Sequence, residues 1–202
     1  MFINKSNLFK LIYFLDSVMI SIINLLQQRK ASRAFSSELL AKECIDKLMN
    51  AAQLSASCFN NQPWRFLFLN EKAVLEKARR ALSKGNSWAK EAPLLIIGFS
   101  KPDLDCQMHD GREYYLFDLG MAVQNILLQA TELNLVARPM AGFSPDMIRN
   151  EFDIPKEFKI IVMIAVGFEG DINKLDEKLQ KISTAPRNRK PISENFFMNS
   201  IK

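Results

Sequence analysis

The stretch REYYLFDLGMAVQNILLQATEL, residues 112–133, decides the fold because it is the longest segment with an unbroken helical period. Its apolar residues recur every three or four positions, as on one face of a helix: Tyr115, Leu119, Ala122, Val123, Ile126, Leu127 and Ala130. Three more apolar residues point away from that stripe, namely Leu116, Met121 and Leu128. Gly120 permits close approach of a neighbouring helix. We therefore expect a helix that is covered on several sides, by the core or by a second subunit.

Shorter patterned segments lie on both sides of this helix. Before it we expect a helix from Ser37 to about Leu54, a strand over 65–70, a helix over 71–82 and a buried strand over 94–100. The first of these is capped by Ser36 or Ser37, and one face carries Leu39, Leu40, Ile45, Leu48 and Met49. After the long helix come the short segment LVARPMAG, a helix that starts at Ser144–Pro145 and ends at Pro155, and a strand over 159–168. The remainder, from Glu169 onward, is charged and weakly periodic, as in an arm that crosses the surface.

Composition fits one globular domain with its own core. The chain has 202 residues, of which 48% are hydrophobic and 24% charged. A single His and three Cys, without a Cys-x-x-Cys motif, leave too few soft ligands for a zinc cluster and argue against a disulfide framework. We therefore expect reduced thiols in a reducing compartment, with Cys58 as a small buried apolar residue.

Positive charge gathers near the two ends of the chain. The formal net charge is +5, and the excess lies in two clusters almost free of nearby acids: Arg29, Lys30 and Arg33, and Arg187, Arg189 and Lys190. No two of the seven glycines are separated by a single residue, so G-x-G-x-x-G is absent, and the P-loop spacing also fails. A phosphate bound by this chain must therefore be held by side chains.

The window SASCFNNQPWRF, residues 55–66, is a polar turn between a helix and a strand. Ser57 offers a hydroxyl, Asn60 and Gln62 offer amides, and Pro63 fixes the backbone. Such a set suits the polar edge of a planar heterocycle, because loops at this position often bind ligands. The alternative is an ordinary capped turn.

Residues 1–21 form an apolar extension before the patterned domain, and the apolar run itself covers residues 8–26. Lys10 and Asp16 interrupt the apolar run, and no small-residue cleavage site follows it. We expect an amphipathic helix packed on the body, with a membrane-facing helix as the alternative. Met19 is a further candidate start, which would leave residues 1–18 dispensable.

The order and spacing of these motifs resemble the nitroreductase family of FMN-dependent oxidoreductases. RKASRAF at 29–35 is followed about two dozen residues later by SCFNNQPW at 57–64, and further matches lie at 118–125, 141–143, 165–167 and 187–194. The resemblance covers roughly residues 22–198. It implies one FMN-binding domain over 22–202 with an α+β fold, in which helices flank a central, mostly antiparallel sheet. It also implies a homodimer with exchanged C-terminal arms and with FMN at the subunit interface, contacted by both chains.

The resemblance assigns the FMN phosphate and the pyrimidine side of the ring to basic residues from both ends of the chain: Arg29, Lys30, Arg33, Arg187 and Arg189. Arg33 is the candidate that stabilises the reduced ring near N1 and the C2 carbonyl, where negative charge develops. Ala31 stands where relatives often carry a serine, so one hydroxyl contact to phosphate is missing, and Ser32 is the candidate replacement.

The remaining cofactor contacts implied by the resemblance come from three other places. Ser57, Asn60 and Gln62 are expected to bond the ring and the ribityl chain. Asn86 is expected at the pyrimidine edge, with a plain turn residue as the alternative. A backbone N–H near Ala141 and Gly142 is expected to point at the flavin N5.

The resemblance also implies the reaction: ping-pong transfer of electrons from NAD(P)H through FMN N5 to a small flat electrophile such as a nitroaromatic or a quinone. The chemistry resides on the flavin, so no catalytic side chain and no metal are expected, and His109 is either a proton donor or a loop residue. Alternatives are a flavin-dependent oxidase or dehalogenase on the same scaffold, and a non-enzymatic binder of nucleic acid or lipid. We expect a cytoplasmic enzyme without a nucleic-acid partner and without membrane contact by the extension.

Overall fold

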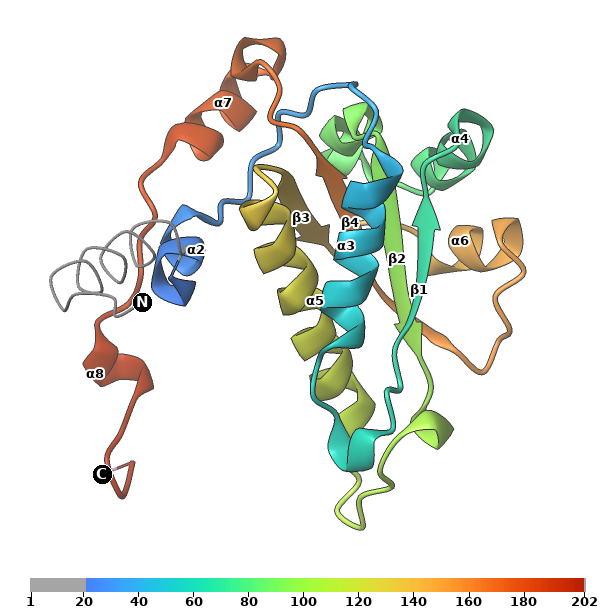
Figure 1. Ribbon diagram of the computed structural model, residues 1–202, viewed down its shortest axis with the longest axis vertical. Helices are drawn as coiled ribbons and strands as arrows, with labels where there is room; N and C mark the ends of the chain where they lie inside the picture. The colour runs from blue at the N-terminus through green and yellow to red at the C-terminus, as the bar shows by residue number, and fades with distance from the viewer. Residues whose placement is uncertain (1–20, 202) are drawn as a thin grey trace, which may run out of the picture.

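A four-stranded antiparallel sheet forms the centre of the molecule (Figure 1). The computed structural model describes residues 21–201, so the alternative start at Met19 and the predicted helix over residues 8–26, up to residue 20, lie outside the described residues. The strand order is β1-β2-β4-β3, and the strands are β1 Arg65–Leu69, β2 Leu94–Ser100, β3 Val136–Met140 and β4 Lys159–Gly167. Every neighbouring pair is antiparallel, which confirms the predicted α+β fold with a central antiparallel sheet.

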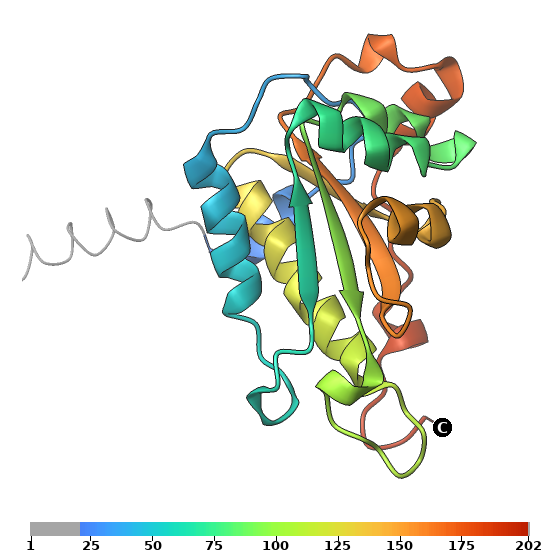
Figure 2. The ribbon, with the colours of Figure 1, turned by 90° about the vertical axis from the view of Figure 1, so that its right-hand side faces the viewer.

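Helices cover both faces of this sheet (Figures 1 and 2). One face carries α3 (Lys42–Gln53) and α5 (Tyr114–Glu132), and the other carries α4 (Lys72–Arg80), η2 (Lys84–Glu91) and α6 (Pro145–Glu151). The central strand β2 contributes side chains to the cores on both faces of the sheet, because successive side chains of a strand point to opposite faces. Leu94 and Ile96 join the core under α3 and α5, whereas Leu95 and Ile97 join the core under α4 and α6.

The long helix α5 carries the predicted stripe. Tyr115, Leu119 and Ile126 are at most 2% exposed, as its periodicity predicts. Leu116 and Phe117 remain 38% and 56% exposed, so one chain leaves part of this helix uncovered. Within the described residues, neither α5 nor any other helix is long and apolar enough to cross a bilayer.

The two ends of the described chain lie outside the two helical layers. They contain α2 (Ile22–Gln28), η4 (Ile172–Lys174), α7 (Glu177–Thr184) and α8 (Ile192–Asn195). In Figure 1, α7 lies above the sheet, and α8 lies away from the sheet. The arm beyond Gly167 carries apolar side chains with little cover: Ile192, Phe196, Phe197 and Met198 are 50–88% exposed.

The predicted start of the first helix at Ser37 is wrong. α3 begins at Lys42 after Ala41, which provides no side-chain cap. The preceding segment is extended instead, because Phe35 forms a bridge with Glu169. Leu39 is consequently 75% exposed rather than part of a helical stripe, and Met49, also predicted in that stripe, is 42% exposed.

Two further boundaries differ from the sequence expectation. The segment VARPM, left unassigned, forms β3, where Pro139 is tolerated because β3 lies at an edge of the sheet. The helix α6 begins after the Ser144 cap as predicted, since Ser144 Oγ accepts from the N–H of Met147 at 3.3 Å. It ends at Glu151, four residues before Pro155, so the proline follows the helix rather than ending it.

Candidate functional site

The segment that follows α2 is fastened to the chain leaving β4. Ser36 N–H donates to the Phe168 carbonyl at 3.0 Å, and Gly170 N–H donates to the Ala34 carbonyl at 3.0 Å. A Cβ on Gly170 would lie 2.3 Å from the carbonyl oxygen of Phe35, so this close pairing requires glycine. The pairing places the first basic cluster beside Glu169.

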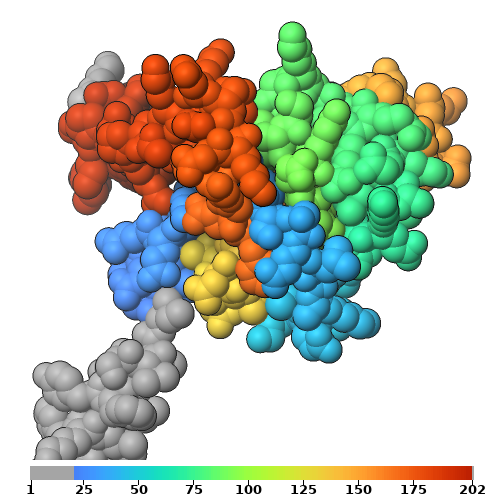
Figure 3. Space-filling view, turned by 90° about the horizontal axis from the view of Figure 1, so that it is seen from above, coloured from blue at the N-terminus to red at the C-terminus, as the bar shows by residue number. Residues whose placement is uncertain are grey.

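The late basic cluster reaches the same place within one chain. Arg187 donates from Nη1 to the Leu26 carbonyl at 2.9 Å and from Nη2 to the carbonyl of Arg29. Seen from above, the early segment and the late arm lie against each other (Figure 3). The structure therefore brings together the early and late arginines that the sequence assigned to one phosphate.

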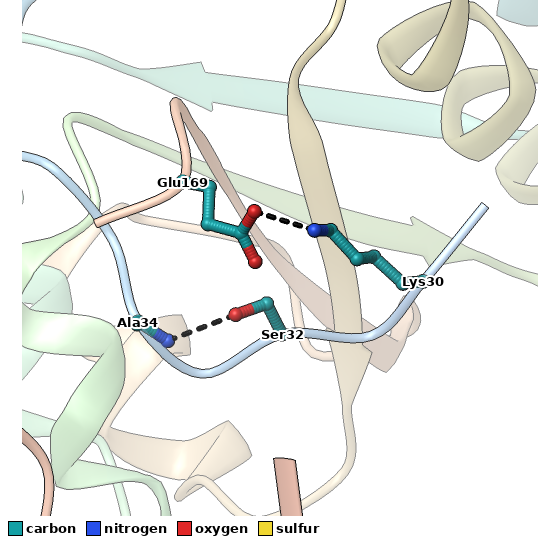
Figure 4. Close-up of polar contacts among 4 residues, drawn as sticks. All are labelled: Lys30, Ser32, Ala34 and Glu169. Atoms are coloured by element: carbon teal, nitrogen blue, oxygen red, sulfur yellow. Dashed lines mark hydrogen bonds and ion pairs between the residues drawn. The ribbon is translucent and has the colours of Figure 1, made fainter. Parts of the chain in front are cut away.

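A cavity of about 390 Å³ lies between these segments. Six cationic side chains line it: Arg29, Lys30, Arg33, Arg138, Arg187 and Arg189. Among the described residues that line it, Glu169 is the one acid, and it forms an exposed ion pair with Lys30 (Figure 4). Five guanidinium groups thus share a cavity without a carboxylate partner of their own within it.

The pKa values of two of these arginines reflect this crowding. Burial, followed by the charges of Arg187 and Arg189, lowers the pKa of Arg29. Burial, followed by the charge of Arg33, lowers the pKa of Arg138 to about 10. An anion in the cavity would reverse both effects, because an opposite charge favours the protonated guanidinium. The cavity is therefore built to accept negative charge.

Arg138 is a member of this site that the sequence reasoning missed. It projects from β3, donates from Nη1 to the carbonyl of Ala31, and lies with its guanidinium carbon 5.2 Å from the centre of the Trp88 ring. The sequence pattern predicts no helix or strand for the segment around it, so it assigns no face to this side chain. The available signal was a single cation in an apolar stretch shortly before Ala141 and Gly142.

Ser32 and Ala31 also line the cavity, in a turn that uses the serine hydroxyl locally. Ser32 is 8% exposed, and its Oγ accepts from the Ala34 N–H at 3.2 Å (Figure 4). This contact leaves the hydroxyl proton of Ser32 as a donor. Ala31 contributes its backbone, since its carbonyl accepts from Arg138.

Asn86 and Gly142 lie in direct contact. Asn86 Nδ2 donates to the Gly142 carbonyl at 2.9 Å, and Ser83 N–H donates to the same oxygen at 3.0 Å. A Cβ on Gly142 would lie 2.6 Å from Asn86 Nδ2, so a side chain there would displace the asparagine. Ala141, the next residue in the predicted contact, is exposed.

A second cavity of about 650 Å³ adjoins the cationic one. The two share Arg33 and Glu169, and the second is also lined by Trp88. Trp88 itself belongs to the core: it is 6% exposed and stacks on Phe35 at 6.0 Å between ring centres. Arg33 therefore lies at the junction of the two cavities.

The polar loop of Ser57, Asn60 and Gln62 lies at the other end of the sheet (Figures 1 and 2). The adjoining Pro63 carbonyl accepts from Ser100 Oγ at 2.8 Å, and Ser100 pairs with Lys159 at the start of β4. Glu169 follows the far end of that nine-residue strand, roughly 26 Å away at about 3.3 Å per residue. One chain therefore does not bring this loop to the cationic cavity.

Within this loop the polar groups bond to one another. Ser57 Oγ accepts from the Gln62 N–H at 3.0 Å, and Gln62 Nε2 donates to the Asn60 carbonyl at 3.1 Å. Gln62 Oε1 accepts from Gln53 Nε2 at 2.9 Å. Gln62 and Asn61 also line a separate cavity of about 500 Å³ between α3 and β1. In the single chain the loop is a well-capped turn.

The expectation of reduced thiols is wrong for two of the three cysteines. Cys58 and Cys106 form a disulfide, with 6.3 Å between their Cα atoms and a sequence separation of 48. Spacing could not show this pairing, because the α3–β1 and β2–α5 connections meet only when β1 pairs with β2 and α3 packs on α5. Cys58 is therefore half-buried and bonded rather than a small buried apolar residue, and Cys44 is a free thiol. His109 lies exposed in the loop that follows Cys106.

Comparison with known proteins gives one consistent result. The family model for the nitroreductase family matches residues 26–168. An oxygen-insensitive NAD(P)H nitroreductase of Enterobacter cloacae is 25% identical, over 85% of this chain and 96% of its own. A crystal structure described as an oxidoreductase containing FMN is 28% identical, with a TM-score of 0.80 over 91% of this chain and 99% of its own. A nitroreductase family protein from Clostridium difficile 630 is 26% identical, with a TM-score of 0.75 over 90% of this chain and 99% of its own.

Proposed function

The chain belongs to the nitroreductase family, and we propose that it is an FMN-dependent oxidoreductase that passes electrons from NAD(P)H to a flat acceptor such as a nitroaromatic or a quinone. The relative from Enterobacter cloacae supports the choice of electron donor, because its name includes NAD(P)H. The similar crystal structure that contains FMN supports the choice of cofactor.

The cationic cavity is the observation that carries this proposal. FMN differs from riboflavin by a phosphate dianion, and a chain without a glycine-rich cradle needs several charge-assisted hydrogen bonds from side chains to hold that group. Six cations around about 390 Å³ supply more donors than one phosphate requires. Burial first, and then the charges of neighbouring arginines, lower the pKa values of Arg29 and Arg138, and an anion would oppose both shifts. The donor set therefore fits the phosphate of FMN.

The other residues of this end would position the ring. Bound FMN supplies the redox centre that takes electrons from NAD(P)H and gives them to the acceptor. Arg33, at the junction of the two cavities, is placed to extend from the phosphate side toward a ring and to stabilise negative charge on it. Asn86, within η2, and the backbone of Ala141 and Gly142 would offer amide groups that lie next to one another.

We propose that the site is completed in a homodimer. Ser57, Asn60 and Gln62 lie about a strand length from the cationic cavity, so a second copy in the opposite orientation could supply them. The exposed apolar residues of α5 and of the C-terminal arm offer surface for such a dimer, with Phe117 and Phe196 56% and 70% exposed. An exchanged arm would cover these residues and bring each arm onto its partner.

The spectrum of the purified protein tests the cofactor. We expect a yellow protein whose visible absorption bleaches on anaerobic addition of NAD(P)H and returns when a quinone is added. A matched variant is Arg33→Ala, which should lose bound FMN while the fold, followed by circular dichroism, remains. A colourless protein that does not bind added FMN at micromolar concentration would contradict the proposed function.

Mixed dimers test whether the site is shared. Arg33→Glu damages the cationic end, and Asn60→Ala combined with Gln62→Ala damages the loop, so neither homodimer should bind FMN. In a doubly tagged heterodimer of the two variants, one site keeps both intact halves, and about half of the sites should bind FMN. Heterodimers that bind no more FMN than either parent would show that the loop does not contribute across the interface.

A further inference from the structure

The Cys58–Cys106 disulfide joins the polar loop to a distant segment. Cys58 opens η1 (Cys58–Asn60), and Cys106 follows η3 (Pro102–Leu104) and Asp105 in the connection between β2 and α5. Both cysteines are half-buried, so each keeps part of its surface open to solvent. The bridge is thus partly exposed, and one of its cysteines lies directly in the loop proposed to contact FMN.

The loop that this bridge holds is strained. Phe59, Asn60 and Gln62 have φ angles of 47°, 58° and 50°, in the left-handed region that favours glycine. Phe59 is 92% exposed, so packing of its ring does not stabilise this conformation. Strained backbone persists only where the surroundings enforce it. The enforcing contacts must therefore be the hydrogen bonds within the loop, such as that of Ser57 with Gln62, and the tethers that join the loop to the rest of the chain.

Two of these tethers converge on the bridge. The Cys58 N–H donates to Oδ2 of Asp118, a fully buried residue of α5, at 2.8 Å. Asn61 Nδ2 donates to Oδ1 of Asp105, the residue before Cys106, at 3.3 Å. If the bridge opens, the second tether can move away with the segment around residue 106, while the first remains on α5.

The surroundings of the bridge also accommodate a reduced state. The two sulfurs and a carboxylate oxygen of Asp105 lie within 4.8 Å of one another. Asp105 Oδ2 is buried and accepts no hydrogen bond from the described residues. Two thiols would bring S–H donors close to this carboxylate. A carboxylate with an unused acceptor therefore lies beside the half-buried disulfide.

We propose that Cys58 and Cys106 form a reversible thiol–disulfide site that sets the conformation of the loop over residues 57–62, and through it the affinity for FMN. The reductant is a dithiol, either small or part of a protein. One of its thiolates attacks a sulfur of the bridge and displaces the other sulfur, and its second thiol then closes the reductant's own disulfide. Two electrons and two protons thereby pass to Cys58 and Cys106, which become free thiols. The proposed effect of the loop conformation on FMN affinity rests on the proposed function.

The redox site is tested without FMN. The protein is equilibrated in buffers of graded dithiothreitol to oxidised dithiothreitol ratio, alkylated, and digested, and backbone hydrogen exchange is followed on the same samples. We expect Cys58 and Cys106 to become alkylated together, and exchange over residues 57–62 to increase about tenfold in the reduced form, as a strained and tethered loop opens locally. Unchanged exchange across the loop after complete reduction would overturn the proposal.

Titration of FMN into the oxidised and the reduced protein is the second part of the test. We expect the dissociation constant of FMN to rise about tenfold on reduction, the equivalent of one or two lost hydrogen bonds. Cys44→Ser should keep this response, and Cys58→Ser combined with Cys106→Ser should abolish it. Failure of FMN to bind either form would refute the proposed function and leave the exchange result intact. If reduction alters hydrogen exchange over residues 57–62 but the oxidised and reduced proteins bind FMN equally tightly, the proposal that this disulfide controls FMN affinity is overturned.

Discussion

The two ends of the sheet hold their polar groups in opposite ways. At one end the arginines around Arg29 and Arg138 crowd together in a cavity whose one acid among the described residues, Glu169, pairs with Lys30. Hydrogen bonds to backbone carbonyls position them, such as that of Arg187 with Leu26. At the other end the loop over residues 57–62 is closed by a disulfide and internal hydrogen bonds. The first end is therefore organised for an absent anion, whereas the second is organised by its own covalent and hydrogen-bonded tethers.

The largest expected effect is on the stability of the end of the sheet that carries the Cys58–Cys106 disulfide, here called the bridged end. Opening the disulfide releases a loop closed over 48 residues, which costs about 2–4 kcal/mol of unfolding free energy. The measurement is denaturant unfolding of the Cys44→Ser protein with and without reductant, a background that removes the free thiol. A midpoint that does not move on reduction would show that the other tethers alone hold this end.

The next effect concerns the cationic end and ligand affinity. Arg138→Gln removes one charged donor while keeping a polar chain over Trp88, and should weaken FMN binding by about 1.5–3 kcal/mol, the usual contribution of a charged hydrogen bond. Fluorescence titration checks it, with Lys47→Ala on the exposed surface of α3 as the matched control. The same affinity in Arg138→Gln and in the wild-type protein would remove this residue from the site.

A smaller effect is expected from Gly142→Ala. The new Cβ would lie within 2.7 Å of Asn86 Nδ2 and Ser83 Oγ, and both are ends of side chains that can turn away. The hydrogen bond from Asn86 to the Gly142 carbonyl is then lost, at a cost of about 1 kcal/mol. Thermal unfolding measures this loss, and Gly85→Ala, where a Cβ meets nothing within 4 Å, is the control. Equal destabilisation by both substitutions would contradict the steric argument.

The smallest effect is a pH dependence confined to the bridged end. Burial, and next the nearby Asp105, raise the pKa of the Asp118 carboxyl. Since the folded pKa exceeds the unfolded one of about 3.9, the associated stability is complete below that value and is lost as pH rises through the folded pKa. Asp118→Asn keeps an acceptor for the Cys58 N–H and should flatten this slope. Urea unfolding between pH 4 and pH 7 tests it, and parallel curves for the two proteins would contradict it.

The comparison of the two ends also explains what the sequence could predict. The helical period around Ile126 and the buried strand with Ile96 determined the layers, because periodicity reports which face is buried. The clustering of Arg29 with Arg187 followed from charge and from the family resemblance. The Cys58–Cys106 bridge and the place of Arg138 depend on pairings between distant segments, which local patterns do not encode.

The most direct measurement compares FMN with riboflavin, two ligands that differ only in the phosphate. We expect the purified protein to bind FMN at least about a hundredfold more tightly than riboflavin, since two or more charged hydrogen bonds would reach the phosphate. We also expect Arg138→Gln to reduce this ratio of affinities. Equal affinity for the two ligands would contradict the assignment of the cationic cavity to the phosphate.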